Sequence, residues 1–205
     1  IKDELREKAA EMKKQGKEAC LAVILVGNDP ASTVYVGNKK KACEYIGIRS
    51  LSYELPEETS ETELLELIGK LNADNAVNGI LVQLPLPKQI NEDKVIAAIA
   101  PEKDVDGFHP ENFGRMALDM TTFIPATPFG ILELLERYGV ETQGKHTVVI
   151  GRSHIVGRPM SILMGRKGFP GNSTVTLTHS YTKNIAQITT QADIIITALG
   201  VPNYL

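Results

Sequence analysis

The sequence predicts an α/β fold with two lobes and an active-site cleft between them. Short apolar runs alternate with segments of helical spacing, which is typical of parallel sheets covered by helices. Residues 101–127 interrupt this alternation, because they are rich in Pro, Asp, Gly and Thr and follow no clear period. We therefore expect domains at 1–120 and 121–205, with residues 101–127 serving as a linker or an active-site loop.

In the first lobe, the clearest strand is Cys20–Val26, a continuous apolar run typical of a strand covered on both faces. Ser60 and Glu63 have the spacing of a capping box, which predicts that a helix begins after Ser60. The other expected strands are Ser50–Glu54 and Gly79–Gln83, and the expected helices are Lys2–Lys14, Ala31–Ile46, Glu61–Leu71 and Asp93–Ile99.

The second lobe repeats the alternation after a helix at Pro128–Tyr138, which has a proline near its first turn. Its expected strands are His146–Ile150, Thr174–Thr178 and Asp193–Ala198, and its further helices are Arg158–Arg166 and Asn184–Gln191. Strands separated by single helices indicate a largely parallel sheet.

Composition and charge are those of an ordinary globular protein. The 205 residues are 42% apolar and 23% charged, with a net charge of −3, and Lys39–Lys41 is the one basic cluster. This argues against a nucleic-acid partner. No run approaches the length of a membrane span, and no signal peptide is recognised at the start of the given sequence.

Two further expectations concern the cysteines and the ends of the chain. Cys20 and Cys43 lie in apolar contexts, which favours buried free thiols in a reducing compartment over a disulfide or a metal site. The chain begins at Ile1 within a helical pattern and ends at Leu205 just after a strand. We expect it to be part of a longer polypeptide, with the second domain C-terminally incomplete.

The segment Lys145–Gly157, read KHTVVIGRSHIVG, predicts a dinucleotide site. An apolar run stops at Gly151, and Ser153 and Gly157 follow before a helix-compatible segment. This is the form of a strand that turns into a helix whose N-terminus can face an anion. The spacing G-x-S-x-x-x-G departs from the usual G-x-G-x-x-G, so a plain strand–helix turn is the alternative.

Residues near this loop favour NADP over NAD. The end of the next strand carries Thr178, His179 and Ser180, where NAD sites usually place an acidic residue for the ribose hydroxyls. Arg152 can pair with a 2′-phosphate, the alternative being a solvated surface arginine. His179 can act as a ligand or a base, although a structural or exposed histidine is the more ordinary role.

Five polar or aromatic residues of the first lobe are candidates for the catalytic chemistry. Tyr35 and Lys39 are four apart and point from one helical face, and Gln83 closes a buried strand at the edge where ligands bind. Asp104 and Asp106 lie in the turn PEKDVDG. Each residue taken singly also has an ordinary structural role. Lys39 fits a solvated helix face and Tyr35 a core or rim aromatic. Gln83 fits a satisfied strand-end amide, and Asp104 and Asp106 fit turn formers.

Five segments in order resemble the methylenetetrahydrofolate dehydrogenase/cyclohydrolase family, the bifunctional FolD-type enzymes. They are YVxxK, GILVQLPLP, PEKDVDGFHP, PATPFG and GRSxIVGRP, and together they extend over essentially the whole chain. The resemblance implies a folate-binding catalytic domain at 1–120 and a Rossmann-type NADP-binding domain at 121–205.

The resemblance also implies a role for individual residues. Lys39 matches the catalytic lysine, Gln83 the glutamine that hydrogen-bonds it, and Asp106 the carboxylate that holds the pterin ring. Tyr35 matches the tyrosine that stacks on the aminobenzoyl ring, whereas Asp104 is expected only to brace its loop. Further substrate-binding positions are Ser32, Leu84 and Pro85, and the cofactor positions are Gly151, Arg152, Ser153, Ile155, Val156, Gly157 and Ser180.

The implied activity is oxidation of 5,10-methylenetetrahydrofolate with NADP, followed by hydrolysis of 5,10-methenyltetrahydrofolate to the 10-formyl product. The resemblance further implies a homodimer, a cytoplasmic location and a place in one-carbon metabolism and purine biosynthesis. Tyr181 departs from the pattern, because many relatives carry a basic residue after the His-Ser pair. Competing hypotheses are a shikimate dehydrogenase-like enzyme and a non-catalytic folate- or nucleotide-binding protein.

Overall fold

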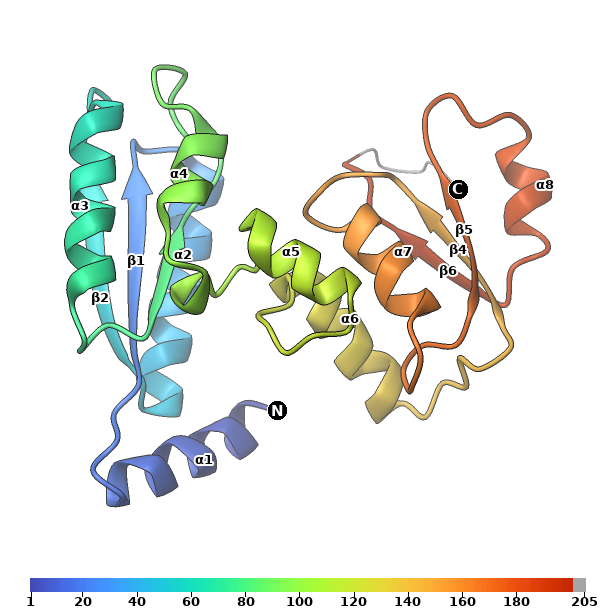
Figure 1. Ribbon diagram of the computed structural model, residues 1–205, viewed down its shortest axis with the longest axis horizontal. Helices are drawn as coiled ribbons and strands as arrows, with labels where there is room; N and C mark the ends of the chain where they lie inside the picture. The colour runs from blue at the N-terminus through green and yellow to red at the C-terminus, as the bar shows by residue number, and fades with distance from the viewer. Residues whose placement is uncertain (201–205) are drawn as a thin grey trace. The chain divides into compact units, whose positions relative to one another are not determined.

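The computed structural model describes residues 1–200, which divide into two compact units, Ile1–Val105 and a second that begins at Asp106. Each unit contains a three-stranded sheet in which all paired strands are parallel (Figure 1), so the predicted α/β class is confirmed. The domain boundary near residue 120 stays a prediction. The expected incomplete C-terminal end concerns residues 201–205, which lie outside the described residues.

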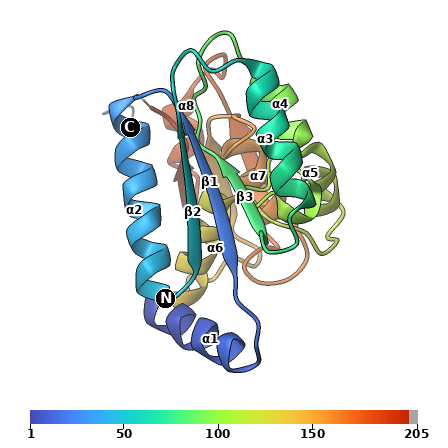
Figure 2. The same ribbon diagram turned by 90° about the vertical axis from the view of Figure 1, so that its left-hand side faces the viewer.

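The sheet of the first unit has the order β2-β1-β3, with β1 at Cys20–Val26, β2 at Arg49–Leu55 and β3 at Gly79–Val82. Helix α2 (Pro30–Ile46) connects β1 to β2, and α3 (Glu61–Ala73) connects β2 to β3. The two helices lie on opposite faces of the sheet (Figure 2). The central strand is therefore covered on both sides, as its unbroken apolar run predicted.

Alternate residues of β1 enter two different hydrophobic cores. Ala22 and Ile24 pack in the core that holds Leu64 of α3, whereas Val23 and Leu25 pack with Val36 of α2. Successive side chains of a strand point to opposite faces, so each helix packs against its own apolar face of β1.

The capping box predicted at the start of α3 is present. Ser60 Oγ accepts a hydrogen bond from the Glu63 amide at 3.2 Å, and Glu63 Oε2 accepts one from the Ser60 amide at 2.8 Å. Two of the amides that a helix start leaves without partners are thereby satisfied.

We expect Ser60→Ala to lower the free energy of unfolding by about 1 kcal/mol, because it removes the acceptor for the Glu63 amide. Urea unfolding followed by circular dichroism measures this loss. Thr62→Ala is the matched control, since Thr62 is exposed in the same helical turn and lies outside the capping box. An equal loss in both variants would refute the role of the cap.

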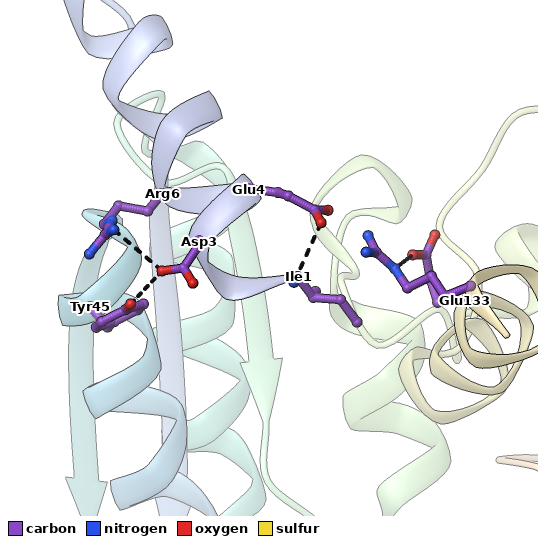
Figure 3. Close-up of polar contacts among 7 residues, drawn as sticks. Ile1, Asp3, Glu4, Arg6, Tyr45 and Glu133 are labelled. Carbon is purple, nitrogen blue, oxygen red and sulfur yellow. Dashed lines mark hydrogen bonds and ion pairs between the residues drawn. The ribbon is translucent and has the colours of Figure 1, made fainter.

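Helix α1 (Lys2–Lys14) has no buried residue and is attached to α2 by polar contacts. Tyr45 of α2 donates a hydrogen bond to Asp3, and Arg6 pairs with Asp3 at 3.3 Å (Figure 3). The Arg6 guanidinium also lies 5.0 Å from the centre of the Tyr45 ring. Helix α4 (Glu92–Ala98) is held differently, because Val95 enters the same core as α3.

The second unit has the sheet order β5-β4-β6, with β4 at His146–Ile150, β5 at Thr174–Thr178 and β6 at Ile194–Thr197. Its core joins the sheet to three helices through Met116, Leu132, Val149, Met160, Leu163, Met164 and Ile196. These helices are α5 (Pro110–Ala117), α6 (Ala126–Arg137) and α7 (Gly157–Gly165), and α8 (Ile185–Thr189) precedes β6.

The expected linker or active-site loop at 101–127 contains two helical segments that its composition did not predict. Pro101–Lys103 forms a 3₁₀ turn, and Pro110–Ala117 forms α5. The latter helix has eight residues with Gly114 in its interior, too few for a clear helical period. Its start does carry a signal, because Pro110 occupies the first helical position after His109, whose Nδ1 accepts from the Glu111 amide. All other expected elements are present, with ends that differ by no more than two residues.

Cys20 in β1 and Cys43 in α2 are both buried, and neither forms a disulfide within residues 1–200. Burial raises the pKa of both thiols above the usual value. Such thiols are poor nucleophiles at neutral pH, which is consistent with a packing role. Among the described helices, none combines the length and the hydropathy that crossing a bilayer requires.

Candidate active site and cofactor loop

The side chains of Lys39 and Gln83 meet at the end of β3. Lys39 Nζ donates a hydrogen bond to Gln83 Oε1 at 3.0 Å, and Gln83 Nε2 donates to the Leu84 carbonyl at 2.7 Å. The second bond fixes the amide so that its oxygen faces the ammonium group. The hydrogen bond that the resemblance implied between these two residues is therefore present.

The sheet topology explains how residues 44 positions apart come together. The Gln83 amide continues the β1–β3 ladder by donating to the Ile24 carbonyl at 2.9 Å, so Gln83 lies beside the end of β1. Helix α2 starts a few residues after β1 and presents Lys39 one turn after Tyr35. Lys39 is half-buried, whereas the neighbouring Lys40 and Lys41 are exposed.

The start of α2 is capped by Asp29, with Pro30 at the first helical position. Asp29 Oδ1 accepts from the Ser32 amide at 2.7 Å. The amide and the hydroxyl of Ser32 hold the pKa of this carboxyl below its usual value. Ser32 is only 2% exposed, while Tyr35 on the next turn is 61% exposed. The tyrosine ring is therefore accessible to a ligand. Ser32 instead contacts Asp29, the residue that caps the start of α2.

The turn PEKDVDG is anchored to the first unit at two points. Asp104, which is buried, forms a parallel bridge with Ile80 of β3. Lys103 Nζ donates to the carbonyls of Leu71, Asn72 and Asp74 at 3.0, 2.8 and 2.8 Å. These carbonyls lie at the C-terminal end of α3, where a cation is favoured. No local pattern indicates this role of Lys103, because its carbonyl partners lie about 30 residues away along the chain.

Asp106 and Gly107 open the second unit. Asp106 is half-buried and Gly107 is buried with a φ of +66°. A Cβ at position 107 would lie 2.7 Å from the Pro125 nitrogen. Glycine is therefore required where PEKDVDG passes the segment PATPFG.

The loop between β4 and α7 is closely packed around two glycines. Gly151 has a φ of +107°, and a Cβ there would lie 2.6 Å from the Ala198 carbonyl oxygen. A Cβ on Gly157 would lie 2.0 Å from the Gly151 carbonyl oxygen. Both contacts are with backbone atoms, so this loop needs glycine at both positions. The backbone that follows the strand can then approach a ligand directly.

Ser153 closes the same loop in place of the usual second glycine. Its Oγ accepts from the amides of Val156 and Gly157 at 3.1 and 3.3 Å, which leaves the hydroxyl proton free to donate. Arg152, Ser153 and Ile155 are exposed, and Val156 is half-buried. The loop therefore offers a cation and a hydroxyl donor above a tight turn, which suits a phosphate group.

The end of β5 lies beside this loop, because Ile150 pairs with Thr178 and the Gly151 amide donates to the Thr178 carbonyl at 2.9 Å. His179 is half-buried, and Ser180 is exposed. No acidic side chain stands at this strand end to bind a free ribose 2′-hydroxyl. The residues present fit a dinucleotide with a phosphate at that position.

Comparison with known families decides the assignment. The sequence model of the tetrahydrofolate dehydrogenase/cyclohydrolase catalytic domain matches residues 1–106, and that of the family's NAD(P)-binding domain matches residues 125–205. The chain belongs to the tetrahydrofolate dehydrogenase/cyclohydrolase family. The family that the five motifs resembled is thereby confirmed.

Relatives within the tetrahydrofolate dehydrogenase/cyclohydrolase family match along the whole chain. The bifunctional protein FolD of Flavobacterium psychrophilum is 71% identical over all of this chain and 70% of its own length. That of Christiangramia forsetii is 64% identical over all of this chain and 69% of its own length.

Solved structures of the family show the same fold. The bifunctional FolD enzyme of Campylobacter jejuni has a TM-score of 0.95 and 49% identity, over 100% of this chain and 71% of its own. The Trypanosoma brucei enzyme, solved with NADP and an inhibitor, has a TM-score of 0.91 and 35% identity, over 98% of this chain and 68% of its own.

A more distant likeness bears on the competing enzyme hypothesis. Shikimate 5-dehydrogenase from Thermus thermophilus has a TM-score of 0.50 and 15% identity, over 87% of this chain and 68% of its own. At this identity the likeness concerns the fold alone. The family matches over both units therefore exclude the shikimate dehydrogenase-like hypothesis in favour of the folate enzymes.

Proposed function

We propose that this chain catalyses the NADP-dependent oxidation of 5,10-methylenetetrahydrofolate and the hydrolysis of the resulting 5,10-methenyl compound to 10-formyltetrahydrofolate. The observation that carries this proposal is the Lys39–Gln83 hydrogen bond in a chain of this family. Relatives that are 71% and 64% identical are named as bifunctional FolD proteins, which supports both activities.

For the oxidation, bound NADP supplies a hydride acceptor. The residues of the second unit bind and orient this cofactor. Gly151 and Gly157 keep the turn tight, and Arg152, Ser153 and Ser180 would hold the 2′-phosphate. Ile155 and Val156 provide apolar contacts at the start of α7. Loss of a hydride requires no base, so this half of the reaction depends on orientation of the two rings.

Hydrolysis of the methenyl compound requires proton transfers. Water adds to the cationic carbon and loses one proton. A ring nitrogen then gains a proton as its bond to that carbon breaks, and the new hydroxyl loses its proton to become the formyl carbonyl, so one proton is released overall. We assign these transfers to Lys39, the half-buried lysine of α2 whose Nζ reaches Gln83 at the end of β3. Gln83 orients the Lys39 side chain through a neutral acceptor, which fixes its position without adding a negative charge.

The remaining substrate contacts are assigned to residues that match the family motifs. The exposed ring of Tyr35 stacks on the aminobenzoyl ring, and Asp106 holds the pterin. Ser32, Leu84 and Pro85 complete the substrate site near the ends of β1 and β3. The roles of these residues rest on their match to the family motifs.

We further propose that the enzyme acts as a cytoplasmic homodimer and that its 10-formyl product supports purine biosynthesis. The family resemblance supports these assignments. The two buried free thiols in the described residues are consistent with a reducing compartment.

A spectrophotometric assay tests the proposal directly. The protein is mixed with 5,10-methylenetetrahydrofolate and NADP, then with NAD, and the absorbance of reduced cofactor and methenyl compound is followed. Decay of added methenyl compound is measured separately. NADP reduction together with accelerated decay is expected. Folate binding without turnover in either assay would identify a binding protein instead and overturn the proposal.

We expect Arg152→Ala to weaken NADP binding by roughly 10- to 100-fold, because a charge-assisted contact to the 2′-phosphate is lost. NAD binding should be little affected, since NAD lacks that phosphate. Calorimetric titration with both cofactors measures the two effects. Arg158→Ala is the matched control, as Arg158 is exposed on the adjoining helix. Equal losses for both cofactors in Arg152→Ala would remove this residue from recognition of the 2′-phosphate.

A further inference from the structure

Tyr181 follows β5 beside the cofactor loop, and the structure gives it a specific neighbour. The Arg152 guanidinium lies over the Tyr181 ring, 5.9 Å from its centre. We propose that Tyr181 is a positioning residue that holds Arg152 in the orientation needed to bind the 2′-phosphate of NADP. This inference rests on the cofactor assignment made above.

The contact joins the two loops that form the cofactor site. Arg152 follows β4, and Tyr181 follows β5, the strand paired with β4 through Ile150 and Thr178. The hydrogen bond from the Gly151 amide to the Thr178 carbonyl fixes the base of one loop against the other. The sheet therefore holds the backbones of the two loops side by side, which brings the two side chains within reach of each other.

The Tyr181 ring is carried by a closed turn. The Thr182 amide donates to the His179 carbonyl at 2.8 Å, and the His179 amide donates to Thr182 Oγ1 at 2.9 Å. The Tyr181 amide donates to His179 Nδ1 at 3.2 Å, and the two rings meet edge to face at 6.2 Å. These contacts orient the Tyr181 ring even though its side chain is 80% exposed.

A tyrosine can support phosphate binding here without contributing a charge. A guanidinium over an aromatic face is attracted by the π-electrons, while its N–H donors lie in its own plane and stay available. Arg152 forms no ion pair with an acidic side chain within residues 1–200, so no carboxylate competes for these donors. The aromatic contact restricts a long, exposed side chain before the phosphate arrives.

Calorimetric titration of the protein with 2′,5′-ADP and with 5′-AMP tests this inference apart from turnover. Tyr181→Ala is expected to weaken 2′,5′-ADP binding by roughly two- to fivefold, the effect of one exposed cation–π contact, and to leave 5′-AMP binding unchanged. Tyr181→Phe keeps the aromatic face and is expected to behave like the wild type. Tyr138→Ala is the matched control, since Tyr138 is a similarly exposed tyrosine of the same unit.

The decisive comparison uses the Arg152→Ala background. There, adding Tyr181→Ala should produce no further loss of 2′,5′-ADP affinity, because the ring acts through the guanidinium. A loss that persists in this background, or that affects 5′-AMP equally, would overturn the positioning role. If the wild type prefers 2′,5′-ADP and Tyr181→Ala has no effect, only this inference fails. If the wild type shows no preference, the proposed role of Arg152 fails with it.

Discussion

Lys39→Met is expected to slow hydrolysis of the methenyl compound by roughly 10²- to 10⁴-fold, the usual contribution of a positioned acid–base group. Methionine keeps much of the length and apolar volume of lysine but cannot donate or accept the proton. Folate binding should persist, because the ring contacts come from other residues. Decay of methenyl absorbance measures hydrolysis, and calorimetry with the folate substrate measures binding.

Lys40→Met is the matched control for Lys39→Met, because Lys40 is the next residue of the same helix and is exposed. It should hydrolyse the methenyl compound at the wild-type rate. Undiminished hydrolysis by Lys39→Met would remove Lys39 from the mechanism. Equal losses in both variants would show that the positive charge of the helix matters rather than the one lysine beside Gln83.

Gly157→Ala is the second substitution with a large expected effect, because it disrupts the cofactor loop from within. The added Cβ would lie 2.0 Å from the Gly151 carbonyl oxygen and 2.9 Å from the Arg152 nitrogen. These are backbone atoms, so no side-chain rotation can relieve the clash and the loop itself must move. We expect a loss of roughly 1–3 kcal/mol in the free energy of unfolding, the usual cost of overpacking. We expect NADP affinity to fall by more than tenfold.

Gly165→Ala provides the control within the same helix. Its Cβ would meet only Val175 Cγ2, at 3.8 Å, and Gly165 lies at the other end of α7. Helical alanine in place of glycine should leave stability unchanged or raise it by about 0.5–1 kcal/mol. Thermal unfolding and calorimetry with NADP compare the two variants. Wild-type NADP affinity in Gly157→Ala would show that the tight packing of this loop is dispensable.

The elements that the sequence predicted best are those with local signals. The run Cys20–Val26 is buried on both faces, and the Ser60–Glu63 spacing encodes a cap that is present. Helix α5 was missed because eight residues interrupted by Gly114 give too short a period to recognise. Local pattern thus predicts an element when the element is long or carries its own cap.

The candidate site depended on information that no local pattern contains. Spacing alone assigns Lys39 to a solvated face, because it stands in a run of three lysines. Packing of β3 beside β1 is what brings Gln83 to it. The resemblance to the family, which rests on five motifs in order, is what implied the hydrogen bond between Lys39 and Gln83. Neither route indicated that Lys103 binds three carbonyls at the end of α3, or that Arg152 lies over Tyr181.

The two-sided packing of β1 divides the side chains of one strand between two helices. Val23 and Leu25 support the helix that carries Lys39, whereas Ala22 and Ile24 support the helix whose end receives Lys103. Neighbouring codons therefore act on different parts of the enzyme. Substitutions at Val23 or Leu25 are expected to act first on the packing of α2, and those at Ala22 or Ile24 on the packing of α3.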